Sequence, residues 1–307
     1  MNPLSRRDFI VTGAALGAAS TLVGQDLPTK AIVHGKIKQS VCSWCFTGNG
    51  SKWSLDQLCQ ITVKLGCPSV ELLSPDAFPT LKKHGLTCAM TSNTMPGGFR
   101  RGFNNLKHRE ELTTRTKKVI DAAAEFGSPS VIAFTGMEWI DPEDPKSGTI
   151  SRDEGAKNCV AGLNEIAGYA EKKKVTVCLE HLNTRDDSHP MKGHPGYQGD
   201  DLDYCVDILK AVGSPRVKLL FDIYHVQVMH GDVIRRLAQN KEWIGHIHTA
   251  GNPGRGELDE NQEIFYPAVM RQLLKNGYTG FVGQEFIPTR DALSGLTAAL
   301  KWCDVSE

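Results

Sequence analysis

The segment 218–225 constrains the fold more than any other part of the chain. It reads Lys-Leu-Leu-Phe-Asp-Ile-Tyr-His, so a short apolar run stops at Asp222 and a histidine follows three residues later. A buried strand of a parallel sheet reads as a continuous apolar run, and a charged residue at its end is expected where the sheet opens to solvent. Asp222 is therefore a candidate metal ligand, although an aspartate after a strand also commonly caps the next helix.

Three other segments repeat this pattern, and each ends in a residue that can hold a metal ion. They are 175–180, 243–248 and 280–285, which end at Glu180, His248 and Glu285. The steps of 42, 26 and 37 residues between successive candidates each suit one helix, one strand and two connections. If the strands are consecutive in a barrel, their carboxyl ends converge on one mouth, where (β/α)8 enzymes have their active sites.

The four residue types define a class of metal site. Two glutamates, one aspartate and one histidine make an oxygen-rich set of donors with a single nitrogen. Such a set favours Mn²⁺ or Mg²⁺, leaves Co²⁺ or Zn²⁺ as alternatives, and argues against a thiolate-type zinc site. The sequence therefore predicts one divalent metal ion held by Glu180, Asp222, His248 and Glu285.

The order of elements along the chain predicts one α/β domain, a (β/α)8 or TIM barrel, over residues 37–307. Strand-like apolar runs and helical runs alternate eight times in this region. The remaining strands are expected at 37–46, 69–73, 87–91 and 130–134. Long loops at 93–105 and 136–151 could roof the site, since long loops inside a compact domain are often functional. The runner-up, a doubly wound open sheet, gives no reason for four neighbouring strand ends to meet at one point.

The N-terminal 25 residues differ in character from the rest. The sequence Ser-Arg-Arg-Asp-Phe-Ile from Ser5 precedes a weakly apolar run, rich in Gly and Ala, that ends at Gly24. This pattern resembles a twin-arginine export leader, and residues 26–36 read as a linker. We expect export to the periplasm, with anchoring by an uncleaved leader as a second outcome and a frayed N-terminus of a cytosolic enzyme as the plainer alternative.

Composition excludes several classes of function. Lys plus Arg and Asp plus Glu number 35 each, so nothing indicates a nucleic-acid partner. No phosphate-binding glycine loop follows a strand, so no nucleotide cofactor is expected. The only lysine near these strand ends, Lys218, lies at the wrong end for a Schiff-base aldolase. Nine cysteines cannot all pair, and their apolar surroundings indicate small core residues, including Cys42 and Cys45 of a single C-x-x-C.

The two candidate glutamates suit acid–base chemistry. A metal ion would polarise the carbonyl of a hydroxy-carbonyl substrate and stabilise the enediolate that forms when a neighbouring proton leaves. Glu180 and Glu285 come from the fifth and eighth predicted strands, at opposite ends of the ligand arc. They are therefore the predicted catalytic pair that removes and returns the proton.

Four further residues are candidates for substrate binding, and each has a plainer interpretation. His225 could donate to a substrate oxygen or begin a helix, and Arg255 could clamp a carboxylate or lie in solvent. Asn183 could orient the substrate or cap a turn, and Glu71 could face the mouth or pair with a neighbouring strand. His246 lies one layer below His248, so we expect it in the core or behind the ligands.

Several motifs together resemble a known family. They are Glu180, Phe221-Asp222-Ile223-Tyr224-His225, Gly245-His246-Ile247-His248, Asn252-Pro253-Gly254-Arg255 and Gln284-Glu285-Phe286. From about residue 37 onward, the chain resembles the hydroxypyruvate isomerase family, within the xylose isomerase-like group of (β/α)8 barrels. Resemblance implies the same four metal ligands, the two glutamates as acid–base pair, and His225 and Arg255 near the substrate.

The implied reaction interconverts hydroxypyruvate and 2-hydroxy-3-oxopropanoate through a cis-enediol. Two features depart from the family pattern: Gly256-Glu257 follows Arg255 where the family continues as GRHE, and an export leader is unusual for a cytosolic metabolic step. The expected function is thus a metal-dependent isomerase of a small hydroxy-carbonyl compound or sugar, which could act as a homo-oligomer. The alternatives are a ketose 3-epimerase, a dehydratase or lyase, and a non-catalytic sugar-binding barrel.

Overall fold

Seven parallel strands form the centre of the computed structural model, which describes residues 30–48 and 51–307. The strands are β1 (Lys38–Cys42), β2 (Val70–Glu71), β3 (Ser130–Phe134), β6 (Thr176–Glu180), β7 (Val217–Asp222), β8 (Ile244–Thr249) and β9 (Phe281–Gln284). They are hydrogen-bonded in the order β2-β1-β9-β8-β7-β6-β3. The predicted leader at 1–25 and the start of the predicted linker lie outside the described residues.

The gap between β3 and β2 is bridged by the third predicted strand, residues 87–91, which forms isolated bridges rather than a regular strand. Thr91 bridges Val131 on one side and Leu73 on the other. Between these bridges a side-chain hydroxyl serves as the hydrogen-bond partner of the backbone: Ser69 Oγ accepts from the Ala89 N–H at 2.9 Å. The ring of strands is therefore closed, and the predicted TIM barrel is confirmed.

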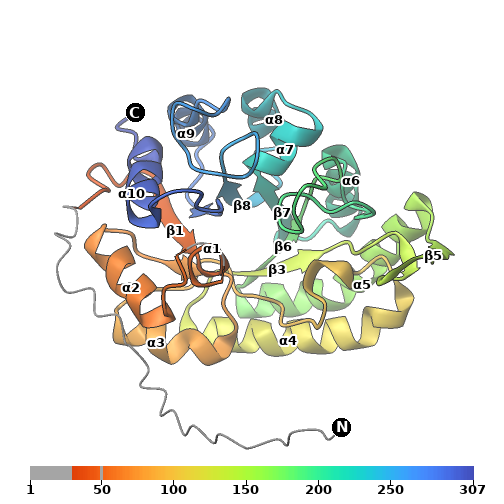
Figure 1. Ribbon diagram of the computed structural model, residues 1–307. Coiled ribbons are helices and arrows are strands. Elements are labelled where there is room, and N and C mark those ends of the chain that lie inside the picture. The colour runs from red at the N-terminus through yellow and green to blue at the C-terminus, as the bar shows by residue number, and fades with distance from the viewer. Residues whose placement is uncertain (1–29, 49–50) are drawn as a thin grey trace, which may run out of the picture.

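Helices surround the strands on all sides (Figure 1). The long ones are α2 (Leu55–Lys64), α4 (Arg109–Phe126), α5 (Arg152–Lys173), α6 (Leu202–Val212), α9 (Tyr266–Lys275) and α10 (Ala292–Cys303), and the shorter ones are α3 (Phe78–Lys83) and α8 (Val233–Gln239). Short 3-10 turns are η1 (Pro75–Ala77), η2 (Gly98–Arg100) and η3 (Leu106–His108). The predicted capping box is present at α2, where Ser54 and Gln57 satisfy each other's backbone N–H.

Two helices at the mouth were not predicted. The first predicted strand stops at Cys42 and continues as α1 (Ser43–Thr47), so the C-x-x-C runs from a strand end into a helix. Helix α7 (Ile223–Met229) begins directly after β7, because the Asp222 side chain accepts from the backbone N–H of His225 at 3.1 Å. Both helices follow the carboxyl ends of strands and so lie at the open end of the barrel.

The predicted loop at 136–151 contains an antiparallel hairpin of β4 (Trp139–Asp141) and β5 (Asp144–Thr149). Most residues of this hairpin are exposed and polar, so no alternation of apolar residues marked it in the sequence. All nine cysteines are buried, as predicted, and none is paired in a disulfide. No helix in the described ranges is both long and apolar enough to cross a membrane.

The described part of the predicted linker is attached to the barrel. The backbone N–H groups of Ala31 and Ile32 donate to the carbonyl of Leu65, and those of His34 and Gly35 donate to the Asp304 carboxylate at 2.8 Å. The chain ends of the barrel are therefore joined by hydrogen bonds near the C-terminus of α10.

Replacement of Gly102 by alanine tests the close packing of the loop after β3. A Cβ at Gly102 would lie 2.1 Å from the carbonyl of Thr135, which is backbone and cannot move aside cheaply. We expect Gly102→Ala to destabilise the fold by at least about 2 kcal/mol. Gly168→Ala is the matched control, because it lies within α5 with no atom within 4 Å of the new Cβ, and it should stabilise by roughly 0.5–1 kcal/mol. Denaturant unfolding checks both, and equal effects would contradict the packing argument.

Candidate active site

The four predicted metal ligands lie together at the carboxyl ends of four consecutive strands. Glu180 ends β6, Asp222 ends β7, His248 lies in β8, and Glu285 follows β9. Each offers one ligand atom, and these atoms all lie within 4.8 Å of one another. The parallel register causes this, because it sets Asp222 beside His248 and His248 beside Gly283, two residues before Glu285.

The donor atoms of this cluster fit a divalent cation. His248 Nδ1 lies 3.0 Å from Glu285 Oε2 and 3.5 Å from Glu180 Oε1. Glu180 Oε1 and His248 Nδ1 are buried without a hydrogen-bond partner among the described residues. Three carboxylates buried in one place repel each other, and buried polar atoms without partners are costly. A divalent ion would reduce the repulsion among the carboxylates and give the two buried atoms a partner, so the residues present fit the predicted metal.

Arg255 supplies a fixed positive charge beside the cluster. Its Nη2 donates to Glu285 Oε2 and lies 3.4 Å from Asp222 Oδ2, and the side chain is buried. Burial raises the pKa of Asp222 to about 7, although Arg255 opposes this effect. Burial also acts to raise the pKa of Glu285, but His248 and Arg255 outweigh it and hold that pKa well below its usual range.

Asp222 makes the contact expected of a helix cap and keeps its second oxygen outside that contact. Its Oδ1 accepts the backbone N–H of His225 and so caps α7, while its Oδ2 faces Arg255. A carboxylate has enough lone pairs for both contacts. The helix cap therefore fixes the direction of the oxygen that remains for a ligand.

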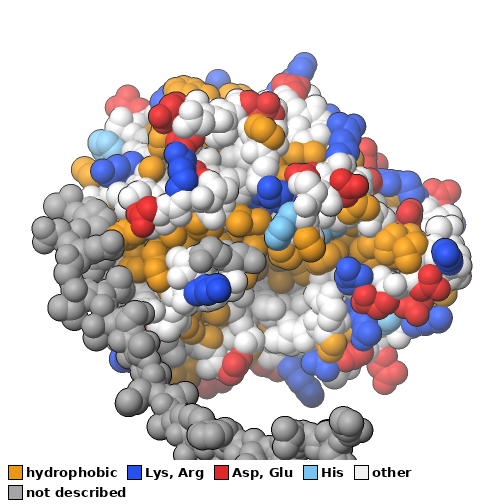
Figure 2. Space-filling view, in the orientation of Figure 1, with side chains coloured by type: hydrophobic (Ala, Val, Ile, Leu, Met, Phe, Trp, Pro, Cys, Tyr) orange, Lys and Arg blue, Asp and Glu red, His pale blue; other side chains and the backbone are white. Residues whose placement is uncertain are grey.

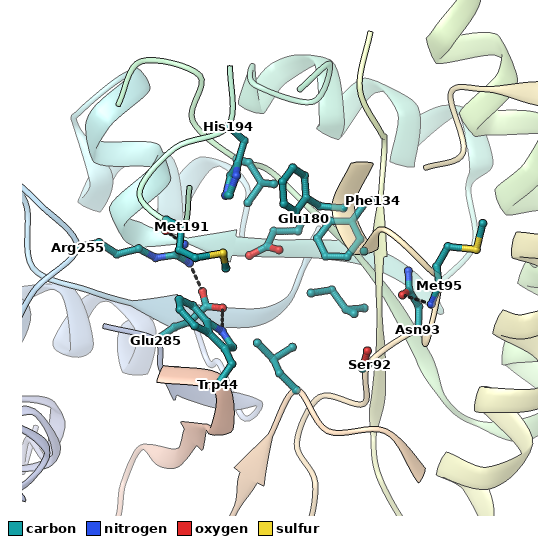
Figure 3. Close-up of a pocket in the computed structure, with 15 residues that line it drawn as sticks. Trp44, Ser92, Asn93, Met95, Phe134, Glu180, Met191, His194, Arg255 and Glu285 are labelled. Carbon is teal, nitrogen blue, oxygen red and sulfur yellow. Dashed lines mark hydrogen bonds and ion pairs between the residues drawn. The ribbon is translucent and has the colours of Figure 1, made fainter. Parts of the chain in front are cut away.

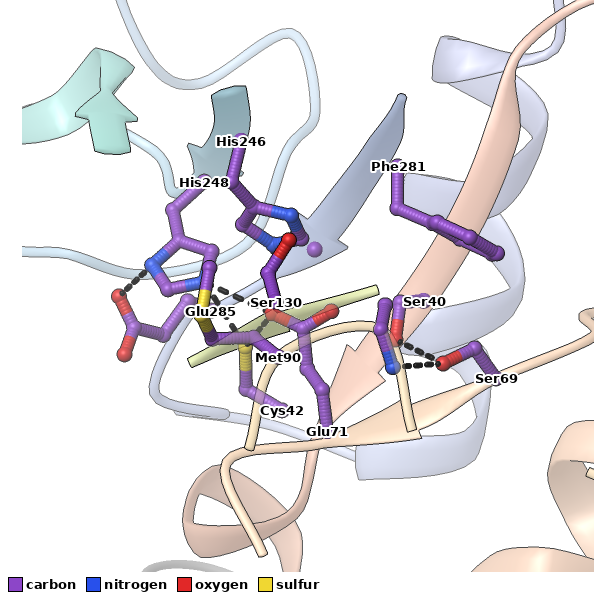
Figure 4. A network of polar contacts seen from close by, with 12 residues as sticks. Ser40, Cys42, Ser69, Glu71, Met90, Ser130, His246, His248, Phe281 and Glu285 are labelled. Atoms are coloured by element: carbon purple, nitrogen blue, oxygen red, sulfur yellow. Dashed lines mark hydrogen bonds and ion pairs between the residues drawn. The ribbon is translucent and has the colours of Figure 1, made fainter. Parts of the chain in front are cut away.

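Glu71 lies behind the cluster, where it pairs with residues of a neighbouring strand, the second of its two interpretations. Its Oε1 accepts from His248 Nε2 at 2.8 Å and from His246 Nε2 at 2.9 Å, and the Cys42 thiol lies 3.5 Å away (Figure 4). Because Nε2 of His248 donates in this contact, Nδ1 is the nitrogen that faces the carboxylates of the cluster. A Cβ at Gly283 would lie 2.5 Å from Glu71 Oε1, so the glycine makes room for this contact.

Asn183 and His225 contact each other next to the ligand cluster. Asn183 Oδ1 accepts two backbone N–H groups of its own loop, from Arg185 and Asp186, and its Nδ2 lies 2.6 Å from His225 Nδ1. With its amide used in these contacts, Asn183 orients the imidazole rather than facing the cavity. His225 is buried, and its Nε2 lies 3.6 Å from Asp222 Oδ2 without a hydrogen-bond partner in the described ranges.

A cavity of about 230 Å³ opens in front of the cluster (Figure 3). Glu180, Glu285 and Arg255 line it, as do Trp44 and His194, which were not predicted. Trp44 Nε1 donates to Glu285 Oε1 at 2.9 Å, and the guanidinium of Arg255 lies 5.3 Å from the Trp44 ring centroid. One sequence signal pointed to Trp44, namely its place between the two cysteines at a strand end, but the prediction treats that segment as continuous strand.

These features define a class before any comparison: a (β/α)8 barrel whose mouth holds one histidine and three carboxylates. Residues 59–304 match the family model described as the xylose isomerase-like TIM barrel, and the chain belongs to this family. The predicted family resemblance is thus confirmed.

Curated relatives narrow the class. The chain is 32% identical over 247 residues to the 2-oxo-tetronate isomerase of Cupriavidus necator, which covers 77% of this chain and 87% of that protein. It is 29% identical over 145 residues to the hydroxypyruvate isomerase of Escherichia coli strain K12, which covers 47% of this chain and 52% of that protein. These relatives confirm the prediction of an isomerase.

A solved structure agrees in fold. The AP endonuclease family 2 protein from Brucella melitensis superimposes with a TM-score of 0.70 over 85% of this chain and 97% of that chain, at 24% sequence identity. At this identity the likeness establishes the barrel fold alone.

Substitution of Glu71 tests whether it holds His248 for metal binding. We expect Glu71→Gln to weaken Mn²⁺ binding about 10–100-fold, because the amide holds the imidazole less firmly and makes it a weaker ligand. Calorimetric titration of metal-stripped protein measures this directly. Ser40→Ala is the control, since it also removes a buried hydrogen bond, to Ser69, but from residues outside the cluster. Equal affinity in wild type and Glu71→Gln would rule out this role.

Proposed function

We propose that the protein is a metal-dependent isomerase that interconverts a small 2-oxo, hydroxy compound and its aldose or ketose isomer through a cis-enediol. Hydroxypyruvate and 2-hydroxy-3-oxopropanoate are the first candidates, and 2-oxo-tetronate, named for the relative in Cupriavidus necator, is the next. The observation that carries the proposal is that Glu180 and Glu285 line one cavity and both belong to the ligand cluster.

In this proposal, Glu180, Asp222, His248 and Glu285 hold one divalent metal ion, with Mn²⁺ or Mg²⁺ favoured by the three carboxylates and Co²⁺ or Zn²⁺ as alternatives. The bound ion supplies electrophilic stabilisation of the oxygens of the reacting carbonyl and hydroxyl groups. Glu71 keeps the protonated nitrogen of His248 turned away from the cluster, so the other nitrogen stays available.

The chain's own residues supply the proton transfer. One glutamate removes the proton from the hydroxyl-bearing carbon, and the other returns a proton to the former carbonyl carbon. The proton of the hydroxyl group passes to the former carbonyl oxygen, so atoms and charge balance. Trp44 holds one oxygen of Glu285 by a hydrogen bond, which orients that carboxylate. Arg255 contacts Glu285 and Asp222 and is placed to bind a substrate carboxylate or oxygen at the same edge of the cavity.

The alternative functions use the same carboxylates and differ in their products. A ketose 3-epimerase would return the proton to the carbon from which it came, and a dehydratase would expel water from the enediol. A non-catalytic sugar-binding barrel would do neither. The isomerase names of the curated relatives favour isomerisation.

Isotope exchange with two glutamate variants tests the proposal. Mn²⁺-loaded protein that turns over hydroxypyruvate in heavy water should place deuterium on a substrate carbon without elimination of water. Mass spectrometry measures both. Glu180→Gln and Glu285→Gln should each lower kcat by about 10²–10⁴-fold, because each removes one proton-transfer group.

Glu257→Gln is the matched control, since Glu257 is a buried glutamate that instead binds the backbone of Thr289 and Arg290. Loss of water from the product would indicate a lyase, and exchange without isomerisation would indicate an epimerase. Full turnover by Glu285→Gln would contradict its role in proton transfer.

We propose in addition that residues 1–25 direct export by the twin-arginine route, which carries folded proteins. Nine buried, unpaired cysteines support this order of events, because thiols stay reduced when a protein folds in the cytoplasm before transport.

Conservative replacement of the arginine pair tests the leader. We expect Arg6→Lys with Arg7→Lys to hold the protein in the cytoplasm, as measured by fractionation and immunoblotting. Lys36→Arg, a matched conservative change beyond the leader, should leave localisation unchanged. Normal export of the double variant would show that another signal is used.

A further inference from the structure

A second cavity lies at the opposite end of the barrel from the active site, where the strands begin. It has a volume of about 480 Å³. Five neighbouring strands contribute to it: Ser130 begins β3, Thr176 begins β6, Arg216 precedes β7, Ile244 begins β8, and Gly280 precedes β9. The ligand cluster lies at the carboxyl ends of four of these strands, so the two sites are about 13 Å apart along β6.

Arg216 brings an unpaired positive charge to this cavity. Its side chain is partly buried, and no carboxylate lies within 4.0 Å of it in the described ranges. The carboxylate of Glu171 accepts instead from Ser214 Oγ at 2.7 Å. Of the N–H donors of the guanidinium, only Nη1 has a partner among these residues, Thr176 Oγ1 at 3.2 Å. The other donors are therefore available to an anion.

Two lysines add to this charge. Lys241 lines the cavity, and its one carboxylate neighbour in the described part of the chain is Glu242 at 4.0 Å, with both side chains more than half exposed. Lys218 Nζ donates to the backbone carbonyl of Glu242 at 2.7 Å and forms no ion pair with any described residue. An exposed ion pair at 4.0 Å is weak, so three positive side chains gather beside one carboxylate that offsets little of their charge.

Elsewhere on the surface, basic side chains have close acidic partners. Figure 2 shows Lys and Arg next to Asp and Glu around the edge of the face that it presents. Arg100 pairs with Glu143 at 2.7 Å, and Arg152 pairs with Asp200 at 2.9 Å. The unbalanced positive charge at the second cavity is therefore a local feature, and a cavity bordered by such charge attracts anions.

Neutral donors complete the lining of this cavity. Ser130 and Thr176 are register partners in β3 and β6, and both carry hydroxyl groups; Ser130 is only 4% exposed. The backbone N–H groups of Thr279 and Gly280 have no hydrogen-bond acceptor within residues 30–48 and 51–307. Guanidinium, ammonium, hydroxyl and backbone N–H groups are the donors that bind phosphate oxygens in proteins.

We propose that this cavity is a binding site for a phosphate group, either free or carried on a small polar molecule. Arg216 donates to two phosphate oxygens, Lys241 supplies a second positive charge, and the hydroxyl groups of Ser130 and Thr176 complete the contacts. The bound group links the starts of strands whose other ends carry the ligand cluster. It therefore stabilises the barrel without entering the active site.

Titration of inorganic phosphate into the Mg²⁺-loaded, full-length protein, followed by phosphorus-31 NMR, tests the site. We expect a Kd of about 1 mM, and Arg216→Gln should weaken binding by at least about 10-fold, because it removes the bidentate donor. Arg271→Gln is the matched control, since Arg271 is exposed on α9, lies outside the cavity and makes the same change of charge. Phosphate that binds equally well to folded Arg216→Gln, for instance at the metal, would overturn the proposal.

Thermal unfolding gives an independent measurement. Phosphate at 20 mM should raise the Tm of the wild-type protein by about 3–6 °C relative to NaCl of equal ionic strength, and should not raise that of Arg216→Gln. Lys241→Gln is a second variant that should fold normally, because the Lys241 side chain is 51% exposed. It should weaken phosphate binding by about 3-fold, since it removes one of the charges beside the site. Equal Tm shifts in wild type and both variants would contradict the site.

Glycerol 3-phosphate and glycerol distinguish the two sources of the phosphate group. Tighter binding of glycerol 3-phosphate than of inorganic phosphate, with no binding of glycerol, would support a phosphate carried on a small polar molecule. Weaker binding of glycerol 3-phosphate would support free phosphate. If neither phosphate compound binds at 20 mM, the proposal is wrong, whatever the outcome of the isomerase assays.

Discussion

The mouth of this barrel is organised by the balance of charge among side chains that the parallel sheet brings together. Glu180, Asp222 and Glu285 are buried within reach of His248, and Arg255 is the only cation that contacts them in the described ranges. Carboxylates removed from water and placed side by side require positive charge nearby. One arginine offsets part of this negative charge, and a divalent metal ion would offset the rest. The same side chains would then determine both the stability of the mouth and its chemistry.

The groups behind the ligands are as constrained as the ligands themselves. Glu71 holds both His246 and His248, and the absence of a side chain at Gly283 leaves space for that contact. Asn183 orients His225 in the same way, and Trp44 orients Glu285. His248, His225 and Glu285 therefore each have a partner that fixes the direction of the side chain.

The cavity has this polar centre on one side and apolar side chains on the other. The apolar side chains come from the end of β2, from β3 and from the two loops that follow residues 91 and 180. Family membership establishes the barrel, and the curated relatives support the isomerase class. The loop residues Met95 and Phe99 and the strand residues Ile132 and Phe134 come from distant parts of the chain. A small number of substitutions there would alter the substrate without changing the ligand cluster, as the separation of scaffold and loops in such barrels permits.

The sequence alone determined the barrel, its strands to within a few residues, and the four residues of the cluster, because apolar runs that end in a ligand repeat at spacings suited to strand and helix. Tertiary structure alone decided what each remaining polar residue contacts. Glu71 and Asn183 were predicted beside the substrate, yet both face a histidine, since the direction of a side chain depends on strand register and loop path. Three features were not predicted, for the same reason: helix α7, the hairpin of β4 and β5, and the apolar side of the cavity. None has a local periodic pattern, and each is defined by contacts between segments far apart in the chain.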